Sequence, residues 1–127
     1  MVNEVTVGTL GPAAARVLSD AVARIASRLQ LSNAKLGAIM GLSGRTVSRL
    51  RAGQYRLKPG SKPFELAQHL LYLSCSLDRW LGLEDGSARS WLTTPNLDLG
   101  ERPIDLLSTV RGLLRTSDYV DALRARA

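Results

Sequence analysis

Residues 32–53 read SNAKLGAIMGLSGRTVSRLRAG, and their pattern predicts two short helices joined by a tight turn. Ser32 and Ser43 are each suited to cap a helix, because a serine hydroxyl accepts a hydrogen bond from a free backbone N–H of the first turn. Gly41 is expected to end the first helix in a left-handed conformation, and Gly53 to end the second. The apolar positions of the first helix share one face: they are Leu36, Ile39 and Met40.

The second of these helices is expected to have two different faces. At about 100° per residue, Val47 and Leu50 lie on one side, and Arg45 and Arg49 on the other. Arg51 does not share the arginine face, and we expect it to contact either phosphate or a neighbouring helix. The arrangement is typical of a helix-turn-helix, whose second helix enters the major groove of DNA.

The charge around this unit favours a nucleic-acid partner. Residues 21–64 hold nine Lys or Arg and no acid, whereas a solvated surface normally mixes both signs. Arginine pairs with guanine edges, and basic side chains bind phosphate. The alternative is that the arginines form only a solvated face. The residues predicted to contact DNA are Ser32, Asn33, Lys35, Ser43, Gly44, Arg45, Thr46, Ser48, Arg49, Tyr55, Arg56 and Lys58.

The whole chain has 127 residues and a formal net charge of +6, which is unevenly placed. Residues 1–63 hold ten Lys or Arg and two acids, whereas residues 64–127 hold seven and nine. A basic half joined to a mildly acidic half indicates polyanion binding at one end and a different task at the other.

Several classes of protein are excluded by composition. One cysteine, Cys75, rules out a disulfide framework, and one histidine cannot supply a clustered zinc site. We therefore expect no metal and no cofactor, and we expect Cys75 to be buried in an apolar helix. No apolar run is long enough to cross a membrane and no signal peptide is visible, so we expect a cytoplasmic protein.

The rest of the chain also has a helical pattern. We expect a first helix from Pro12 to about Leu29, with residues 1–10 forming either a short strand or a frayed tail. Pro63 should begin a longer helix with a broad apolar face, which Gly82 should end. The apolar positions of the first helix include Val17, Leu18, Val22, Ile25 and Leu29.

Two domains are predicted, over residues 1–81 and 82–127. In the second, we expect short helices around Trp91 and after Pro103, then a final amphipathic helix beyond an interruption at Gly112. It contains no catalytic constellation of residues, so its default interpretation is an interaction domain rather than an enzyme. Its candidate core residues are Trp91, Leu92, Leu97, Leu99, Ile104, Leu106 and Leu107.

Two family resemblances follow from these motifs. LGAIMGLSGRTVSRLRAG, at 36–53, resembles the helix-turn-helix of Xre/Cro-type proteins. From about residue 80 onward, the chain resembles the Xre/MbcA/ParS-like toxin-binding domain. The matching positions are Trp91, Leu92, Pro95, Asn96, Leu99, Gly100, Pro103, Leu106, Leu107 and Gly112.

The resemblance implies an all-α fold, with an Xre/Cro-like helix-turn-helix bundle followed by a small helical toxin-binding domain. It implies the antitoxin of a type II toxin–antitoxin system, which neutralises a NAD-degrading RES-domain toxin by blocking its active site. The complex would bind operator DNA and repress its own operon. The residues expected to contact the toxin are Trp91, Pro95, Asn96, Tyr119, Leu123, Arg124, Arg126 and Ala127.

Some alternatives remain open at the level of sequence. The terminal arginines either approach the toxin pocket or form a solvated end. We expect a homodimer, formed through the apolar face of the helix after Pro63, within a larger toxin complex. The rival function is a stand-alone transcription regulator whose second half dimerises or senses a ligand. A nucleotide-processing enzyme is a second rival, which the missing catalytic constellation disfavours.

Overall fold

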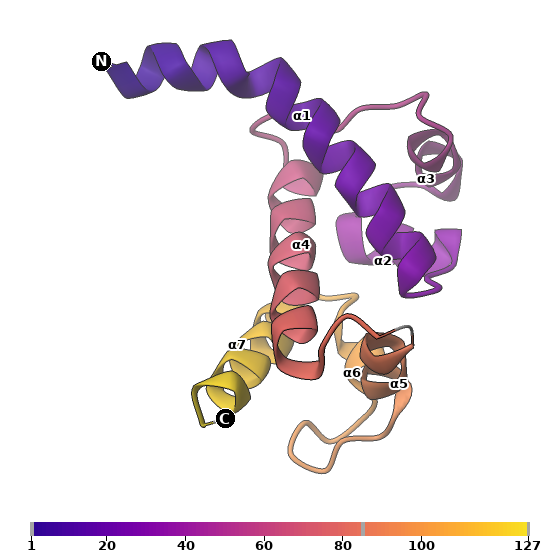
Figure 1. The fold of residues 1–127 in the computed structure, drawn as a ribbon. Helices are drawn as coiled ribbons and strands as arrows, with labels where there is room; N and C mark the ends of the chain where they lie inside the picture. The colour runs from indigo at the N-terminus through magenta and orange to yellow at the C-terminus, as the bar shows by residue number, and fades with distance from the viewer. Residues whose placement is uncertain (1, 85, 127) are drawn as a thin grey trace.

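A computed structural model describes residues 2–84 and 86–126 of the chain, with side chains from Gly11 onward. Its described residues form helices and no strand, so the predicted all-α class is confirmed. Figure 1 shows α4 between the N-terminal helices and the C-terminal ones. The helices are α1 (Val2–Arg28), α2 (Asn33–Met40), α3 (Gly44–Arg51), α4 (Lys62–Leu81), α5 (Ser87–Thr93), α6 (Pro103–Leu106) and α7 (Val110–Arg126).

The first helix differs from its prediction at the N-terminal end. α1 begins at Val2 rather than at Pro12, which lies inside the helix. Proline lacks the N–H that would bond the carbonyl four residues earlier, and this favours a bend. Figure 1 shows α1 changing direction along its N-terminal half. The expected strand or frayed tail over residues 1–10 was therefore wrong.

The buried face of α1 is narrower than predicted. Leu18, Val22 and Ile25 are buried, but Val17 is 58% exposed. Leu18, Val22 and Ile25 follow the spacing of one helix face, and Val17 lies about 100° away from Leu18 on the same helix. Val17 therefore does not belong to the core.

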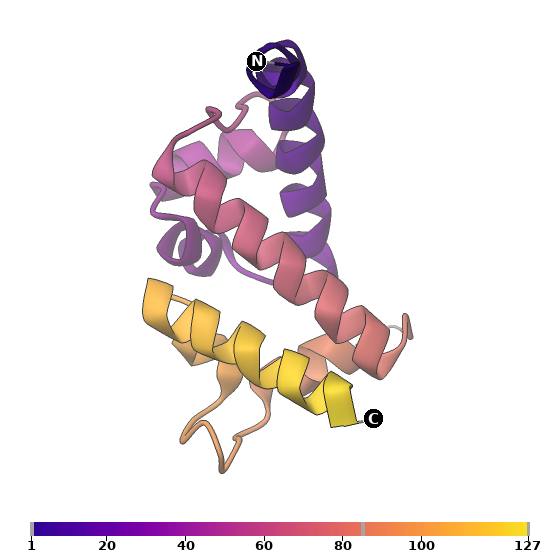
Figure 2. The same ribbon diagram turned by 90° about the vertical axis from the view of Figure 1, so that its left-hand side faces the viewer.

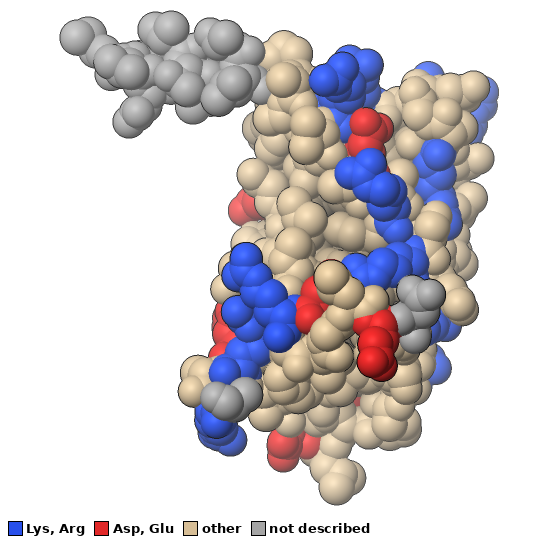
Figure 3. Space-filling model, in the orientation of Figure 1, with Lys and Arg blue, Asp and Glu red and all other residues tan. Residues whose placement is uncertain are grey.

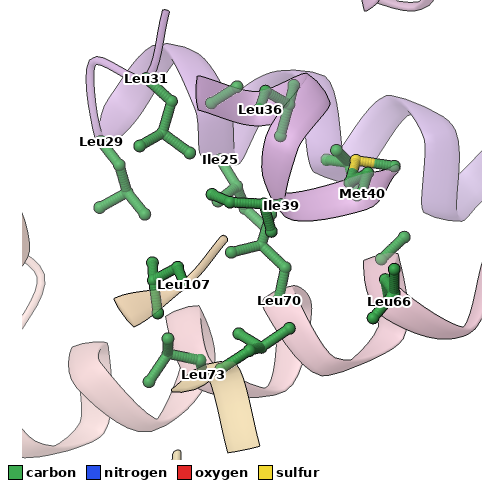
Figure 4. Packing of buried hydrophobic residues seen from close by; sticks show 14 of the residues in the cluster. Ile25, Leu29, Leu31, Leu36, Ile39, Met40, Leu66, Leu70, Leu73 and Leu107 are labelled. Carbon is green, nitrogen blue, oxygen red and sulfur yellow. The ribbon is translucent and has the colours of Figure 1, made fainter. Parts of the chain in front are cut away.

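One hydrophobic cluster joins the two halves of the chain. Leu70 and Leu73 of α4 point toward Ile39 of α2 and toward Leu107, which follows α6 (Figure 4). All four are buried, and burying a leucine or isoleucine stabilises the fold by roughly 1.5–3 kcal/mol. The halves predicted as separate domains thus share a core, and the boundary at residue 82 stays a prediction.

The apolar face of α4 is occupied within the chain. Its buried leucines, among them Leu66, Leu70 and Leu77, pack in the cluster between α1, α2 and α7. A dimer formed through these leucines would have to displace those helices. The buried leucines are therefore not free to form a dimer interface, but other residues of the face are only partly buried, and the homodimer and its interface stay predictions. The partly buried residues are Phe64, Leu71, Trp80 and Leu81.

Cys75 was also placed wrongly, because it is exposed. Leu73 and Leu77 mark the buried face of α4. Cys75 lies two residues from each, and two residues are about 200° of helical rotation, so its side chain points away from the core.

Two predictions in the C-terminal half also need correction. Gly112 lies within α7 rather than interrupting it, and the break falls earlier, between Leu106 and Val110. Leu97 is fully exposed, at 101% of its reference area, instead of belonging to the core. By contrast, Leu92, Leu99, Ile104 and Leu107 are buried as expected.

Polar contacts tie the C-terminal helices to the N-terminal half. Arg89 of α5 donates to the carbonyl oxygen of Leu29 at 2.9 Å, where α1 has just ended. Lys35 of α2 lies 3.9 Å from the carboxylate of Asp105 in α6. Within the N-terminal half itself, Arg28 of α1 forms a two-pronged ion pair with Asp78 of α4. The contacts of Arg89 and Lys35 hold the two halves in one arrangement.

Candidate functional site

The turn between α2 and α3 is built as the sequence predicts. The Ser32 hydroxyl accepts a hydrogen bond from the backbone N–H of Lys35 at 3.0 Å. The Ser43 hydroxyl accepts one from Thr46 at 3.1 Å. Gly41 has a φ of 71°, the left-handed conformation expected at the end of α2. Both short helices are therefore fixed by their own caps.

Close approach of the backbone holds α3 against α2. A Cβ atom at Gly37 would lie 2.5 Å from the carbonyl oxygen of Leu42, so only glycine fits there. Val47 and Leu50 of α3 are buried at 0% and 2% exposure. These contacts fix which side of α3 faces outward.

The outward side of α3 carries the predicted arginines. Arg45 and Arg49 are both exposed. Arg49 also donates to the carbonyl oxygen of Gln54 at 3.3 Å, which orients its guanidinium group. The neighbouring positions are small or hydroxyl-bearing, so they would let a nucleic acid approach the helix. Of these, Ser43, Gly44 and Ser48 are exposed, and Thr46 is half-buried.

Arg51 contacts a neighbouring segment of the chain, which is one of the two alternatives expected from its position off the arginine face of α3. Its guanidinium donates to the carbonyl oxygen of Leu31 at 2.7 Å and to the side-chain oxygen of Asn33 at 3.2 Å. It also lies 3.4 Å from the Ser27 hydroxyl. Arg51 therefore fastens α3 to the segment between α1 and α2.

The remaining predicted DNA contacts are spread around α3. Asn33 is exposed at the start of α2, and Lys35 is half-buried beside Asp105. Arg56 and Lys58 are exposed and line a groove against Pro12 of α1. Tyr55 is half-buried and packs against the core.

A basic groove between α1 and α3 was not singled out from the sequence. It has a volume of about 600 Å³ and is lined by Arg24, Arg28 and Arg51, among others. Lys and Arg side chains gather over α1 and α3 on the face shown in Figure 3. Helical spacing of the basic residues in α1 could have indicated Arg24, but the approach of α3 could not be foreseen.

Three aromatic rings meet in the C-terminal half. The Trp91 ring of α5 meets Trp80 of α4 edge-on, with centroids 5.6 Å apart, and stacks on Tyr119 of α7 at 6.4 Å. Such pairs add to the stability that burial of the rings provides. The Tyr119 hydroxyl donates to the Asp98 carboxylate at 2.6 Å, and this hydrogen bond raises the pKa of Tyr119.

Beside this cluster, a groove of about 560 Å³ lies between α4 and α7. Arg124 pairs with Asp121 at 3.4 Å, and Asp121 also accepts a hydrogen bond from Tyr72 at 2.8 Å, which raises the pKa of Tyr72. Arg79 is exposed at the groove. The sequence indicated Arg124, but it did not indicate Tyr72 or Arg79, which join the site only through the packing of α4 on α7.

The other residues predicted to contact the toxin differ in how exposed they are. Pro95 and Arg126 are exposed, and Leu123 is half-buried. The side-chain oxygen of Asn96 accepts a hydrogen bond from the Leu99 backbone at 3.0 Å, so this oxygen holds the loop together. Ala127 lies outside the described residues.

Two negative findings concern the described residues alone. Within residues 2–84 and 86–126, no group of three or more His, Cys, Asp or Glu is placed to hold a metal ion. No helix in this described part of the chain has the length and apolar character needed to cross a membrane.

The fold and these surfaces define a helix-turn-helix protein with a helical partner-binding region. Residues 10–72 match the Antitoxin Xre-like helix-turn-helix domain, and residues 76–126 match the Antitoxin Xre/MbcA/ParS C-terminal toxin-binding domain. The chain belongs to the Xre-type antitoxins, with a toxin-binding domain after its helix-turn-helix. The helix-turn-helix and the toxin-binding domain expected from the sequence are confirmed.

A solved structure gives an independent comparison. The chain is similar to a chain in the crystal structure of the M. tuberculosis MbcT-MbcA toxin-antitoxin complex, with a TM-score of 0.61 and 29% sequence identity. The similarity covers 84% of this chain and 92% of the other. No sequence among the curated proteins matches the chain.

Proposed function

We propose that this antitoxin works through two surfaces at opposite ends of the molecule. α3 binds operator DNA, so that the protein represses its own operon. The surface of α4, α5 and α7 binds a NAD-degrading RES-domain toxin and occludes its active site. The observation that carries the proposal is the match to a toxin-binding domain over residues that form the aromatic cluster and the α4–α7 groove.

The separation of the two surfaces supports simultaneous binding. In Figures 1 and 2, the C-terminal end of α7 lies at the end of the molecule away from α3. A toxin bound there would leave the arginine face of α3 open to DNA. Simultaneous binding is what repression by a toxin–antitoxin complex requires.

The DNA half of the proposal depends on Arg45 and Arg49. Both side chains project from the face of α3 that is opposite the buried Val47 and Leu50. Helix-turn-helix proteins place this helix in the major groove and bind two half-sites as dimers. We therefore include a homodimer in the proposal, with its interface outside the buried face of α4.

The toxin half depends on the arginines beside the α4–α7 groove. Arg79 and Arg126 are exposed, and Arg124 is partly buried next to Asp121. A site that binds the phosphates of NAD presents cationic groups and N–H donors, so we expect these arginines to pair with carboxylates at the rim of the toxin pocket rather than with its phosphate-binding groups. We propose that the C-terminal end of α7 approaches that pocket. We also propose that the protein is cytoplasmic and that it acts by binding rather than by catalysis.

An arginine variant tests whether the two surfaces are separable. Arg45→Ala combined with Arg49→Ala should weaken operator binding about 100-fold, since each good guanine contact contributes roughly 1–3 kcal/mol. The slope of log affinity against log salt should also become shallower if either arginine contacts phosphate. Neutralisation of the toxin should be unchanged. Gel-shift titrations and co-expression survival measure the two properties.

Arg126→Ala is the matched control, because Arg126 is an exposed arginine at the C-terminal end of α7, the end that lies away from α3 (Figures 1 and 2). It should leave operator binding unchanged. Loss of both operator binding and neutralisation in the α3 variant would show that the two surfaces are not independent. Normal operator binding by that variant would remove α3 from the DNA interface.

A further inference from the structure

Leu97 is the most exposed of the large apolar side chains whose burial is described, at 101% of its reference area. It lies in the loop between α5 and α6, next to the exposed Pro95. An exposed leucine alone is ordinary on a protein surface. The loop that carries it, however, is held by several hydrogen bonds, both within the loop and to α7.

Hydrogen bonds within the loop close it on both sides of Leu97. The backbone N–H of Asn96 donates to the carbonyl oxygen of Glu101 at 3.2 Å. The backbone N–H of Gly100 donates to the carbonyl oxygen of Asn96 at 2.8 Å. The side-chain oxygen of Asn96 accepts the N–H of Leu99 at 3.0 Å. Leu97 therefore lies at the tip of a closed turn.

Contacts with α7 hold the same loop against the body of the protein. Arg115 donates to the carbonyl oxygens of Leu99 at 3.2 Å and Asp98 at 3.3 Å. Tyr119 donates to the Asp98 carboxylate at 2.6 Å, and the Leu99 side chain is 4% exposed. Both neighbours of Leu97 are thus immobilised, while its own side chain contacts only solvent. A backbone that is held in place before binding loses less conformational entropy when its side chain enters a partner.

The loop between α5 and α6 lies where a bound protein would not block α3. Figures 1 and 2 both show the loop between α5 and α6 at the end of the molecule opposite the N-terminal part of α1, and beyond α5 and α7. It belongs to the region that matches a toxin-binding domain, residues 76–126. A protein bound at this end would not obstruct α3.

We propose that Leu97 is an anchor residue that enters an apolar pocket on the toxin. This inference rests on the proposed function. The toxin is a better occupant than a second copy of the chain, because the loop lies within the region that matches a toxin-binding domain. Charged groups of both signs flank the turn, so we expect a polar rim around the pocket. These exposed residues are Asp98, Glu101, Arg102 and Arg115.

The test compares Leu97→Ser with Val17→Ser in the chain of 127 residues. Val17 is a matched control, since it is 58% exposed on α1, outside the region that matches a toxin-binding domain. The affinity of each variant for the purified toxin is measured by calorimetry, and thermal unfolding checks the fold. We expect Leu97→Ser to bind about tenfold more weakly or worse, as an anchor residue should, and Val17→Ser to bind like the unaltered chain.

Three outcomes would overturn the inference. Equal affinities for Leu97→Ser and the unaltered chain would show that Leu97 is not an anchor. Loss of self-association by Leu97→Ser with unchanged toxin affinity would assign the loop to a second copy of the chain. Failure of the unaltered chain to bind any toxin would overturn the proposed function itself, and with it the role of Leu97.

Discussion

Gly112 shows how one residue sets the contact between two helices. A Cβ atom at this position would overlap the carbonyl oxygen of Leu106 and lie 2.9 Å from the Thr109 hydroxyl. That hydroxyl accepts the backbone N–H of Gly112 at 3.0 Å, at the start of α7. The glycine therefore permits the sharp connection between α6 and α7, although its sequence context suggested a helix break.

Gly112→Ala should destabilise the protein for this reason. We expect a loss of about 2 kcal/mol or more in the free energy of unfolding, because the backbone of Leu106 must move. Gly44→Ala is the control, since nothing lies within 4 Å of a Cβ there and Gly44 is helical. Chemical denaturation measures both variants. An unchanged midpoint for Gly112→Ala would contradict the close approach.

At the scale of single residues, the sequence predicted which side of a helix some side chains occupy, but it did not predict which residues they contact. The sequence placed Arg51 away from Arg45 and Arg49, which agrees with the structure. That Arg51 contacts Leu31 depends on how the end of α1 packs, and no local pattern contains this information. Cys75 and Leu97 were misplaced because an apolar neighbourhood in sequence says little about which side chain faces the core.

At the scale of elements, helix starts with local signals were predicted well. Ser32 and Ser43 cap the helices that they were expected to cap, and Pro103 begins α6. The start of α1 was predicted wrongly, because a proline suits a first turn but is also tolerated inside a bent helix. The grooves beside α3 and α7 were not predictable, since each forms between helices distant in sequence.

The loop between α5 and α6 should respond to alkaline pH through Tyr119. Its hydrogen bond to Asp98 raises the pKa of Tyr119 above the ordinary value of 10.0. The folded chain thus holds this proton more tightly than the unfolded chain does. The resulting stabilisation is complete below the ordinary tyrosine pKa, and it is lost as pH rises through the raised value.

Tyrosine absorbance measured against pH tests this contact. The difference between the unaltered chain and Tyr119→Phe isolates one tyrosine, and its midpoint should lie above 10.0. Asp98→Asn should bring that midpoint down, since the hydrogen bond to the Asp98 carboxylate is the largest cause of the raised pKa of Tyr119. A midpoint at or below the ordinary value in the unaltered chain would mean that the Tyr119–Asp98 bond does not form in solution.

At the scale of the whole molecule, two functional regions share one core. The uneven charge and the order of the motifs along the sequence predicted two tasks. The shared cluster was not foreseen, because Leu70 and Leu107 are far apart in sequence and meet only through the fold. Under the proposed function, this shared core would connect a toxin-bound α7 rigidly to a DNA-bound α3.

The most direct test of the central proposal is the NAD content of cells that express a candidate RES-domain toxin with and without this chain. The toxin alone should deplete NAD and stop growth, and co-expression of this chain should preserve both. The Arg45→Ala, Arg49→Ala variant should protect equally well, because the proposed toxin surface is separate from α3. Depletion of NAD to the same level with and without this chain would contradict the account.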